Sequence, residues 1–497
     1  MGSATAAPGP ANLAGLVSAA AARDPEGLAL VCSGRGLSWS GLDAAVDAVA
    51  AALRARDLRF GDRVAMSLPN SPGFVELYLG ALRAGLVVAP LDPAAPTADL
   101  QAALADTGAR LHVAEEAAVA ELIAAGQAVL DSQGRPEAGP VPGGESPAAL
   151  LQTAGTGGRP KRAMLSHRAL LANLAQLAAL DPAPVGPGDV VLLALPMFHV
   201  FGLNAVLGQA LYAGATTVFA TDPDPAAVLD LVVTAGITSV AGTPEMYAAW
   251  ADHPGAREAL AAVRVLVSGS APLRPALAAA FREATGRKVW QGYGLTEAAP
   301  VVTASMRAKE GSAREGWVGR PLPGIEVRVV DTDGSDADPG DPGELWVRGP
   351  NLFSGYWPDG RDAPDAEGWF PTGDVAICDP DGDLFLVSTR HDVVVVDGFT
   401  VYPREVEEVL LALPGVAEAA VVAVPDARTG QAVPTRHVMR ALLVPAAGVE
   451  LTPEEVRQFC AARLARFKVP QQIELVSELP RSVAGKIARG LLRDPAG

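Results

Sequence analysis

The chain is poor in cysteine and short of positive charge. Its three cysteines, Cys32, Cys378 and Cys460, lie far apart without metal-ligand spacing. They are therefore expected to be small buried hydrophobic residues in a reducing compartment rather than disulfide partners. The formal net charge of -17 excludes nonspecific binding to nucleic acid or to an anionic membrane, because the field of the whole protein repels phosphate. Any phosphate-bearing ligand must be held by a local site.

Targeting and membrane signals are also scarce. The N-terminus lacks a basic segment that leads into an apolar core, so a secretory signal is not expected. The uncharged stretch 200–221 is long enough to raise the question of a membrane span. Its Asn204, Gln209 and glycines, followed by strand-like residues 216–219, favour a buried helix, a turn and a buried strand instead. We expect a cytoplasmic protein without a membrane span.

The length of 497 residues, 49% of them hydrophobic, suits two or three globular domains. Up to about residue 300, short apolar runs alternate with amphipathic stretches, which predicts parallel strands joined by crossover helices. The expected elements are strands at 64–68, 87–91, 190–195, 237–241 and 263–267, and a helix at 72–85.

The pattern changes from about residue 324, where alternation and Gly, Asp and Pro turns predict an antiparallel subdomain with strands at 326–330 and 344–348. A third region starts near Asp392 and is large enough for a small α+β domain with its own core. Its expected elements are helices at 403–413 and 453–464 and strands at 420–424, 441–444 and 472–476.

The segment from Thr153 to Lys161 combines flexible glycines, hydroxyls and a cation. Exposed backbone N–H groups together with a positive charge are what a triphosphate needs. The segment is not the common loop of kinases and GTPases, because Pro160 precedes Lys161 and no Ser or Thr follows. Taken alone, it is equally typical of a solvated glycine-rich turn.

Further motifs follow that segment in a fixed order. They are Pro196-Met197-Phe198-His199-Val200-Phe201-Gly202, Val267-Ser268-Gly269-Ser270-Ala271-Pro272-Leu273, Gln291-Gly292-Tyr293-Gly294-Leu295-Thr296-Glu297, Gly343-Glu344-Leu345, Trp369-Phe370-Pro371-Thr372-Gly373-Asp374, residues 392–407, and Gly485-Lys486. In this order and spacing the set resembles the adenylate-forming superfamily of acyl-CoA synthetases, luciferases and peptide-synthetase adenylation domains, over essentially the whole chain.

The resemblance implies an α/β fold. A large N-terminal domain, residues 1–390, would consist of stacked α/β subdomains and a β-rich subdomain. Residues 391–497 would form a small mobile α+β domain, with the hinge at His391 or Asp392. Gly398, after the hinge, would swing in and leave room for the thiol arm of coenzyme A.

The resemblance also implies the nucleotide-binding residues. They are Thr153, Gly155, Thr156, Gly157, Gly158 and Lys161 in the loop, Ser270, Ala271 and Pro272 at a strand end, Gln291, Gly292, Tyr293 and Gly294 in the next motif, and Asp374 and Arg390 at the ribose. The Tyr293 ring offers a flat face for adenine. Thr296 would donate to the α-phosphate, while Glu297 and Thr156 would bind Mg²⁺.

The implied catalytic residues are Lys486, Thr296, Glu297 and His199. Lys486 would neutralise the carboxylate and α-phosphate oxygens as they approach each other. Only five lysines occur in the chain, and Lys161 and Lys486 are two of them, which suggests that a compact point charge is needed at both places. His199 would lie beside the carboxylate and the thiol tunnel, although a histidine in an apolar run is more often a core residue.

The implied reaction has two half-reactions. Attack of a carboxylate on ATP gives acyl-AMP and pyrophosphate, and a thiol then takes the acyl group and releases AMP. The form Gly-Tyr-Gly-Leu-Thr-Glu-Ala-Ala-Pro favours a medium- or long-chain fatty acid, and the small or flexible pocket candidates Gly202, Gly242 and Met246 suit an extended chain. Coenzyme A is the expected thiol. A carrier-protein phosphopantetheine, a catalytically degenerate binding protein and a homodimer stay open.

Several positions depart from the family pattern. In the glycine-rich loop Ala154, Gly157 and Arg162 replace the common Ser, Thr and Gly. Nine residues before Gly398 the family usually has Arg, whereas this chain has Thr389 followed by Arg390. Residues 435–440 look inserted. We expect ATP binding to persist, with Arg390 rather than Thr389 at the ribose.

Overall fold

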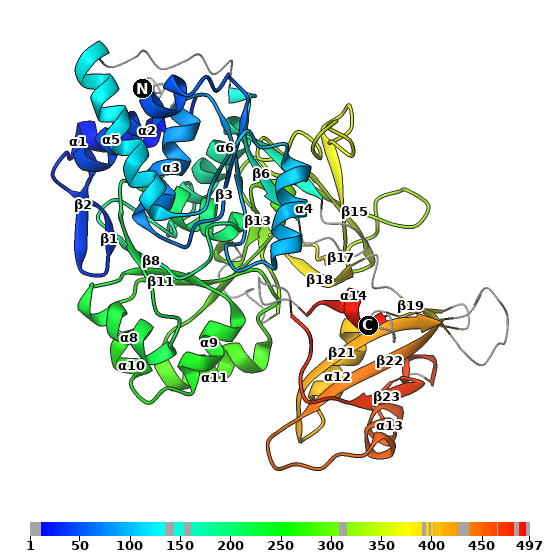
Figure 1. Ribbon diagram of the computed structural model, residues 1–497. Helices are drawn as coiled ribbons and strands as arrows, with labels where there is room; N and C mark the ends of the chain where they lie inside the picture. The colour runs from blue at the N-terminus through cyan, green and yellow to red at the C-terminus, as the bar shows by residue number, and fades with distance from the viewer. Residues whose placement is uncertain are drawn as a thin grey trace, which may run out of the picture. The chain divides into compact units, whose positions relative to one another are not determined.

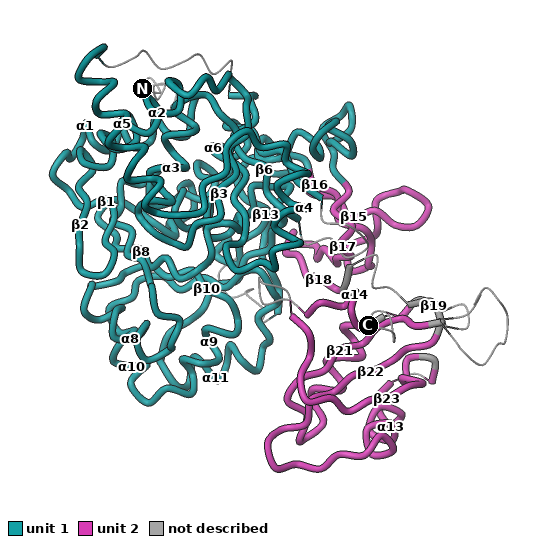
Figure 2. Tube along the Cα trace, in the orientation of Figure 1, with its two compact units in different colours: residues 1–153, 160–326, 348–370 teal, residues 154–159, 327–347, 371–497 magenta. Residues whose placement is uncertain are grey.

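The structure is a computed structural model that describes residues 11–134, 144–153, 161–307, 316–389, 394–396, 399–401, 403–425, 437–464, 466–481 and 487–493. Its contacts divide the chain into two compact units (Figure 2). Unit 1 comprises residues 1–153, 160–326 and 348–370, and unit 2 comprises residues 154–159, 327–347 and 371–497. The boundary expected between residues 390 and 391 falls outside the described residues, so domains 1–390 and 391–497 remain predictions.

A five-stranded sheet in unit 1 has the order β5-β3-β4-β6-β7. Its strands are β3 (Arg63–Met66), β4 (Val87–Pro90), β5 (Leu111–Val113), β6 (Pro147–Gln152) and β7 (Arg162–Ser166). Strands β3, β4, β5 and β6 pair in parallel, as predicted, but β6 and β7 are antiparallel. The sequence analysis did not predict β6 or β7, and the nine residues between them are too few for the crossover helix that a parallel pair needs.

Helices α2 (Trp39–Ala55), α3 (Pro72–Arg83) and α5 (Glu116–Gln133) pack together beside this sheet (Figure 1). Helix α3 begins at Ser71, whose hydroxyl accepts from the N–H of Phe74, and it matches the helix predicted at 72–85. Gly126 of α5 allows close contact with α2, since a Cβ there would lie 1.7 Å from the carbonyl oxygen of Ala48. Helices α1 (Gly15–Arg23) and α4 (Thr97–Thr107) complete the first part of the chain.

A nine-stranded sheet follows in unit 1, with the order β14-β13-β12-β11-β10-β8-β9-β1-β2. Its strands are β1 (Leu28–Cys32), β2 (Arg35–Ser38), β8 (Val190–Leu193), β9 (Thr216–Phe219), β10 (Ser239–Gly242), β11 (Val265–Ser268), β12 (Trp290–Gly294), β13 (Val301–Ala304) and β14 (Arg320–Pro321). The central strands are parallel, as predicted, whereas both edges end in antiparallel pairs.

Four helices lie together against one side of the nine-stranded sheet (Figure 1). They are α8 (Pro225–Thr234), α9 (Pro244–Ala251), α10 (Ala256–Ala259) and α11 (Pro275–Thr285). Tyr247 is at the centre of their core, with its ring edge-on to both Trp250 and Phe281. Its hydroxyl donates to the carbonyl oxygen of Val267 at 2.7 Å, which joins α9 to β11.

The uncharged stretch 200–221 forms a π-helix, η2 (Phe201–Gly208), then α7 (Gln209–Ala213) and strand β9. The prediction of a buried helix, a turn and a buried strand is confirmed, although the widened helical turns were not foreseen. Among the described residues, no helix has both the length and the apolar character needed to cross a membrane.

Unit 2 contains a four-stranded sheet of order β15-β16-β17-β18. The strands are β15 (Glu326–Val330), β16 (Pro342–Arg348), β17 (Trp369–Cys378) and β18 (Leu384–Thr389). The predicted strands 326–330 and 344–348 are found, and β17 pairs with β18 in the antiparallel sense.

The C-terminal part of unit 2 contains a short hairpin, a three-stranded sheet and three helices. These elements are β19 (Val394–Val396), β20 (Phe399–Val401), α12 (Pro403–Leu411), β21 (Val416–Pro425), β22 (His437–Pro445), α13 (Pro453–Ala461), β23 (Gln472–Leu475) and α14 (Arg489–Arg493). Buried residues cover both faces of the sheet, including Val421 and Met439 on one face and Val422 and Leu442 on the other. The carboxylate of Glu407 joins α12 to α14 through Arg489 at 2.9 Å.

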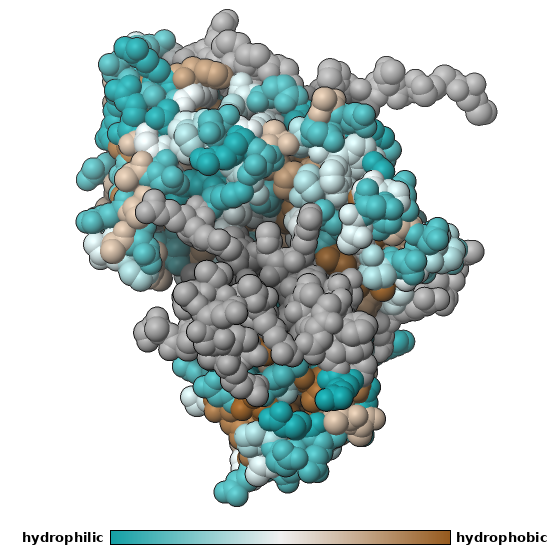
Figure 3. Space-filling model, turned by 90° about the vertical axis from the view of Figure 1, so that its right-hand side faces the viewer, coloured by the Kyte–Doolittle hydropathy of each residue, from teal (hydrophilic) through white to brown (hydrophobic). Residues whose placement is uncertain are grey.

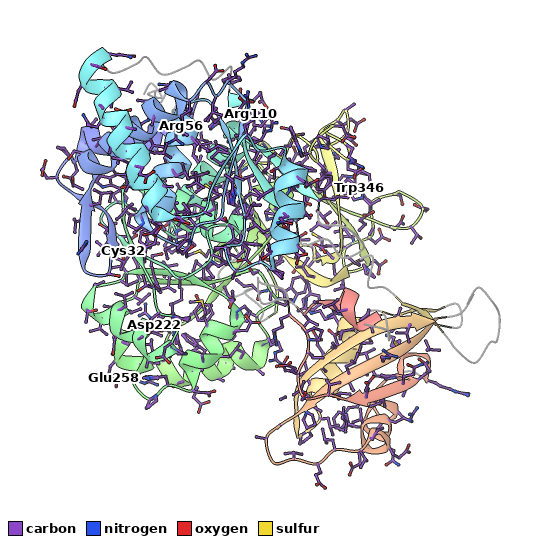
Figure 4. The ribbon with its side chains drawn as sticks, viewed as in Figure 1. Cys32, Arg56, Arg110, Asp222, Glu258 and Trp346 are labelled. Carbon is purple, nitrogen blue, oxygen red and sulfur yellow. The ribbon has the colours of Figure 1, made fainter. Side chains whose placement is uncertain are left out.

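The predicted fold class is confirmed, with its large α/β N-terminal part and small α+β C-terminal part. The expectation for the cysteines is correct for Cys460, which is buried, and wrong for Cys32 at the end of β1 (Figure 4) and for Cys378, which are half-buried. On the face drawn in Figure 3, hydrophilic residues make up most of the described surface, as the charge of the chain leads one to expect.

His167 is the first residue of helix α6 (His167–Ala178) and is only 2% exposed. Its Nδ1 accepts a hydrogen bond from the backbone N–H of Leu13, 154 residues away in the sequence. Burial lowers the pKa of His167 to about 4, and the positive end of the helix dipole also disfavours the imidazolium. The neutral ring therefore joins the N-terminal segment to α6.

We predict that this histidine destabilises the protein as the pH falls. An unfolded histidine titrates near pH 6.5, so the unfolded chain binds more protons than the folded one between pH 6.5 and 4. The stability due to the neutral ring is fully present above pH 6.5 and is lost as the pH falls through this window, by at most about 3 kcal/mol. Urea unfolding at pH 7.5 and 5 should show the loss, and His167→Asn, which keeps an acceptor, should reduce it. An equal pH dependence in both proteins would contradict the prediction.

Candidate active site

The strands β6 and β7 lie directly before and directly after the predicted phosphate-binding segment. Gln152 pairs with Arg162 at the end of this hairpin, and the N–H of Thr153 donates to the carbonyl oxygen of Lys161 at 2.9 Å. The structure therefore brings Thr153 and Lys161 together. Gly155, Thr156, Gly157 and Gly158 lie outside the described residues.

Arg162, one of the departures from the family pattern, has a structural contact. Its side chain is buried, and its Nε donates to a carboxylate oxygen of Asp106 in α4 at 2.6 Å. The indole nitrogen of Trp357 donates to the carbonyl oxygen of Asp106 at 3.0 Å. The start of β7 is therefore tied to the end of α4.

Strand β12 leads into a short 3-10 helix, η3 (Thr296–Ala298), in which Thr296 and Glu297 are both buried. Ala299 ends this turn in the left-handed region, with φ of 63°. Gly294 must be glycine here, because a Cβ would lie 2.2 Å from the carbonyl oxygen of Pro300. The chain therefore doubles back closely at the residues expected to contact the α-phosphate and the metal.

Three donors from other segments fix the backbone of this turn. The N–H of Phe353 donates to the carbonyl oxygen of Glu297 at 2.8 Å. The side-chain amide of Asn351 donates to the carbonyl oxygen of Ala298 at 2.7 Å. The amide of Asn204, from η2, donates to the next carbonyl, that of Ala299, also at 2.7 Å. Both asparagines are fully buried, so each of these carbonyls has a partner where water has no access.

The carboxylate of Glu297 is held by a residue that the sequence did not reveal. The hydroxyl of Tyr356 donates to Glu297 Oε1 at 2.5 Å, and both side chains are buried. Burial, followed by the neighbouring Glu297 carboxylate, raises the pKa of Tyr356 above its ordinary value. The phenol therefore keeps its proton at neutral pH and remains a donor.

Lys161 lies against the same tyrosine. Its Nζ is 4.4 Å from the centroid of the Tyr356 ring and 2.8 Å from a carboxylate oxygen of Asp362. Both members of this ion pair are about half exposed, at 52% and 54%. Lys161, the expected phosphate-binding cation, therefore contacts the ring of Tyr356, while Glu297, the expected metal ligand, accepts from its hydroxyl.

The family implies Mg²⁺ at this site. Mg²⁺ takes hard oxygen ligands and is typically held by one or two carboxylates together with substrate phosphates. Glu297 supplies such a carboxylate, oriented by a hydrogen bond, so the residues present fit the ion. Thr156 lies outside the described residues, and within the described part of the chain no group of three or more His, Cys, Asp or Glu could hold a metal ion.

The expected adenine-binding residues flank two adjacent strand ends. Ser268 of β11 is in register with Gln291 of β12, and the two strands are parallel. The residues Ser270, Ala271 and Pro272 follow β11 after Gly269, while Gly292, Tyr293 and Gly294 complete β12. Ligands of open α/β sheets bind beyond the carboxyl ends of such strands. The predicted residues are therefore neighbours, although their individual roles remain predictions.

His199 lies two residues before the first residue of the π-helix η2, and its Nδ1 accepts from the N–H of Phe201 at 3.2 Å. The ring of Phe201 packs against Gly269, where a Cβ would lie 2.8 Å from it. Gly202 has a packing role, since a Cβ there would meet the carbonyl oxygen of Pro196 at 2.4 Å. A Cβ on Gly242 would meet the Met246 methyl at 3.2 Å. The absence of a side chain at Gly202 is thus explained by close backbone contact rather than by the width of a pocket.

Asp374 belongs to unit 2, where it lies on β17. Its N–H donates to the hydroxyl of Thr372 at 3.1 Å, and that hydroxyl donates to the carbonyl oxygen of Leu345 at 2.8 Å. Across the strand pair, Asp374 is in register with Thr389. The other predicted residues of this part of the chain, Arg390, Asp392, Gly398 and Lys486, lie outside the described residues.

Comparison with known proteins agrees with this arrangement. The profile described as AMP-binding enzyme matches residues 17–357, and that of the AMP-binding enzyme C-terminal domain matches residues 405–486. A feruloyl-CoA synthase from Amycolatopsis sp is 37% identical over 483 residues, covering 94% of this chain and 96% of that protein. A long-chain-fatty-acid--CoA ligase from Escherichia coli O157:H7 is 32% identical over 496 residues, covering 88% and 86%.

Among solved structures, the crystal structure of ATP-bound MatB from Rhodopseudomonas palustris superposes with a TM-score of 0.86 at 32% sequence identity, covering 97% of this chain and 98% of that one. The match therefore extends over almost the whole of both chains. The chain therefore belongs to the AMP-binding enzyme family and is an AMP-forming acid–thiol ligase of the adenylate-forming superfamily.

Proposed function

We propose that this enzyme activates a medium- or long-chain fatty acid with ATP as the acyl-adenylate and transfers the acyl group to coenzyme A. The observation that carries the proposal is the cluster of Glu297, Tyr356 and Lys161, in which the hydroxyl of Tyr356 donates to Glu297 and its ring lies against Lys161. We propose that Glu297 binds the metal ion and that Lys161 binds phosphate. The likeness to a long-chain-fatty-acid--CoA ligase supports the acid class.

In the first half-reaction, the chain's own residues orient ATP and offset its charge. Lys161 and the backbone after Thr153 would bind the phosphates, and Thr296 would donate to the α-phosphate. Mg²⁺, when bound by Glu297 and Thr156, offsets negative charge on the phosphate oxygens. Lys486 would bring a positive charge between the acid and the α-phosphate, which lowers the barrier for attack of one anion on another. Asp374 and Arg390 would hold the ribose.

In the second half-reaction, a thiol takes the acyl group from the adenylate. Lys486 and a thiol channel cannot occupy the same place, so we propose that the C-terminal domain rotates about Asp392 between the two steps. Gly398 would then leave room for the arm of coenzyme A, and His199 would lie next to the reacting carbonyl carbon.

An aryl acid is the second candidate substrate. The relative with 37% identity is a feruloyl-CoA synthase. The ring of Phe201, two residues after His199 in the sequence, packs against Gly269, and we propose that a planar substrate stacks there. Fatty acids remain the first candidate because the motif at 292–300, Gly-Tyr-Gly-Leu-Thr-Glu-Ala-Ala-Pro, has the form that favours a fatty acid as the substrate.

The first prediction of this proposal concerns products. Acids of six to eighteen carbons and a matched set of benzoic and cinnamic acids should be assayed for pyrophosphate release, and then for AMP release with coenzyme A or with a holo acyl carrier protein. We expect acid-dependent pyrophosphate release, AMP release stimulated by coenzyme A, and the highest kcat/KM with a fatty acid. A preference for cinnamic acids would select the second candidate, and the absence of both products would indicate a degenerate binding protein.

The second prediction separates the half-reactions. Lys486→Ala should lower the rate of adenylation by about a hundredfold or more, because it removes a charge that acts on the transition state. Formation of thioester from supplied acyl-AMP should stay near the wild-type rate. Gly398→Leu should do the reverse by filling the thiol channel. Equal losses in both half-reactions would contradict the assignment of Lys486.

The third prediction concerns the ribose. Two alignments place either Arg390 or Thr389 beside it, and Thr389 is in register with Asp374. We predict that Arg390 serves the ribose, since a charged hydrogen bond to a ligand contributes about 2 kcal/mol. Arg390→Ala should then raise the KM for ATP about tenfold or more, whereas Thr389→Ala should stay near the wild-type value. The opposite order would assign the ribose to Thr389 and the hinge to His391.

A further inference from the structure

Tyr356 makes two contacts of different kinds, one through each part of its side chain. Its hydroxyl donates to Glu297 at 2.5 Å, while its ring lies under the ammonium group of Lys161 at 4.4 Å. Asp362, six residues later in the same segment, completes the arrangement by pairing with Lys161 at 2.8 Å. Glu297 comes from η3, Lys161 comes directly before β7, and Asp362 comes from the chain after β16, so only the fold brings them together.

The backbone around Tyr356 is fixed by the strand that comes directly after the phosphate-binding segment. Tyr356 forms an isolated bridge with Ala163 of β7. On one side of it the N–H of Met164 donates to the carbonyl oxygen of Gly355 at 3.0 Å. On the other side the N–H of Trp357 donates to the carbonyl oxygen of Arg162 at 2.9 Å.

The turn after Tyr356 is equally constrained and sets the position of Asp362. The N–H of Tyr356 donates to the carbonyl oxygen of Arg361 at 2.9 Å, and the N–H of Gly360 donates back to Tyr356 at 2.8 Å. Gly355 has a φ of +96°, and a Cβ there would lie 2.2 Å from the carbonyl oxygen of Gly360. This tight loop returns the chain to Lys161, where Asp362 itself adopts a positive φ of 54°.

We propose that Tyr356 is a positioning residue that sets the metal-binding carboxylate and the phosphate-binding lysine relative to each other, and that Asp362 holds Lys161 in a resting position which the phosphates of ATP replace. The hydroxyl restricts the rotation of the Glu297 carboxylate. The ring keeps Lys161 above it without neutralising its charge.

The charges explain why Asp362 can be displaced. An exposed ion pair between single charges is weak and is screened by solvent. The phosphates of ATP carry more negative charge than one carboxylate, so they compete successfully for the same ammonium group. Until then, Asp362 compensates Lys161 close to a buried carboxylate, in a chain whose net charge is -17.

This inference rests on the proposed roles of Lys161 and Glu297 in binding MgATP. Two separate sets of measurements test those roles and the positioning by Tyr356 and Asp362. Calorimetric titration of the unaltered protein with ATP, in the presence of Mg²⁺ and in EDTA, tests the roles themselves. No binding of MgATP by the unaltered protein would overturn the proposed function. Variants at positions 356 and 362 test only the positioning by Tyr356 and Asp362.

Two substitutions at one position separate the hydroxyl from the ring. Tyr356→Phe keeps the ring under Lys161 and removes the donor to Glu297. We expect the Mg²⁺ concentration for half-maximal binding of ATP to rise about tenfold, as the loss of one hydrogen bond to a charged group implies, while ATP binding in EDTA changes less than about twofold. Tyr356→Leu removes the ring as well, so ATP binding in EDTA should also weaken, by about threefold to fivefold.

Asp362→Asn tests the resting position independently, because its side chain is exposed and its loss should leave the fold intact. We expect ATP to bind about threefold more tightly in EDTA, with an unchanged requirement for Mg²⁺. Trp357→Phe is the matched control, since Trp357 lies in the same segment and its side chain contacts Asp106 and Arg63 instead.

Steady-state kinetics with the preferred acid provide a second measurement. Tyr356→Phe should raise the KM for MgATP at limiting Mg²⁺ and recover near-normal kcat when Mg²⁺ is in excess. A requirement for Mg²⁺ equal to that of the unaltered protein, or a Trp357→Phe variant with the same rise, would overturn the role of Tyr356. Weaker binding of ATP by Asp362→Asn would overturn the role of Asp362.

Discussion

A buried carboxylate needs hydrogen-bond donors that hold it in one orientation, and Glu297 receives one from Tyr356. That bond imposes conditions on the surrounding structure. The turn that carries Glu297 must not move, so its successive carbonyls are bonded from outside by Phe353, Asn351 and Asn204. The segment that carries Tyr356 must not move either, and its backbone is bonded to β7.

These supports come from chain segments that are far apart in the sequence. Asn204 lies on the π-helix after His199, whereas Asn351 and Phe353 belong to the segment that leads to Tyr356. One side of the Thr296–Glu297 turn is therefore tied to the part of unit 1 that is expected to bind the acid. The other side is tied to the hairpin that presents Lys161. The link between the segment expected to bind the acid and the turn expected to contact the nucleotide is a buried side-chain amide, that of Asn204.

The sequence predicted the periodic parts of the fold well. Strands such as β3, β4 and β11 and helix α3 appear within a few residues of their expected positions, because buried strands and amphipathic helices have clear periods. The antiparallel β6–β7 pair was missed, since local pattern does not reveal the direction of a partner strand. For the site, the roles of the motif residues remain predictions. Tyr356 was not foreseen, because its contact with Glu297 spans 59 residues and depends on pairing with β7. A Gly-Tyr-Trp triplet at 355–357 was the one visible signal.

The π-helix Phe201–Gly208 is a place where the deletion of a single residue would have a structural cost. A π-helix completes each turn with one more residue than an α-helix, which a single inserted residue can supply. Removal of one residue would restore the ordinary turn and change the facing of the residues inside the widened turns, Asn204 among them, while the segments on either side keep nearly the same facing. Asn204 would then face away from Ala299, and that buried carbonyl would lose its donor. Related chains that lack the extra residue are therefore expected to carry a different side chain to serve the same carbonyl, which makes this position informative when their sequences are aligned.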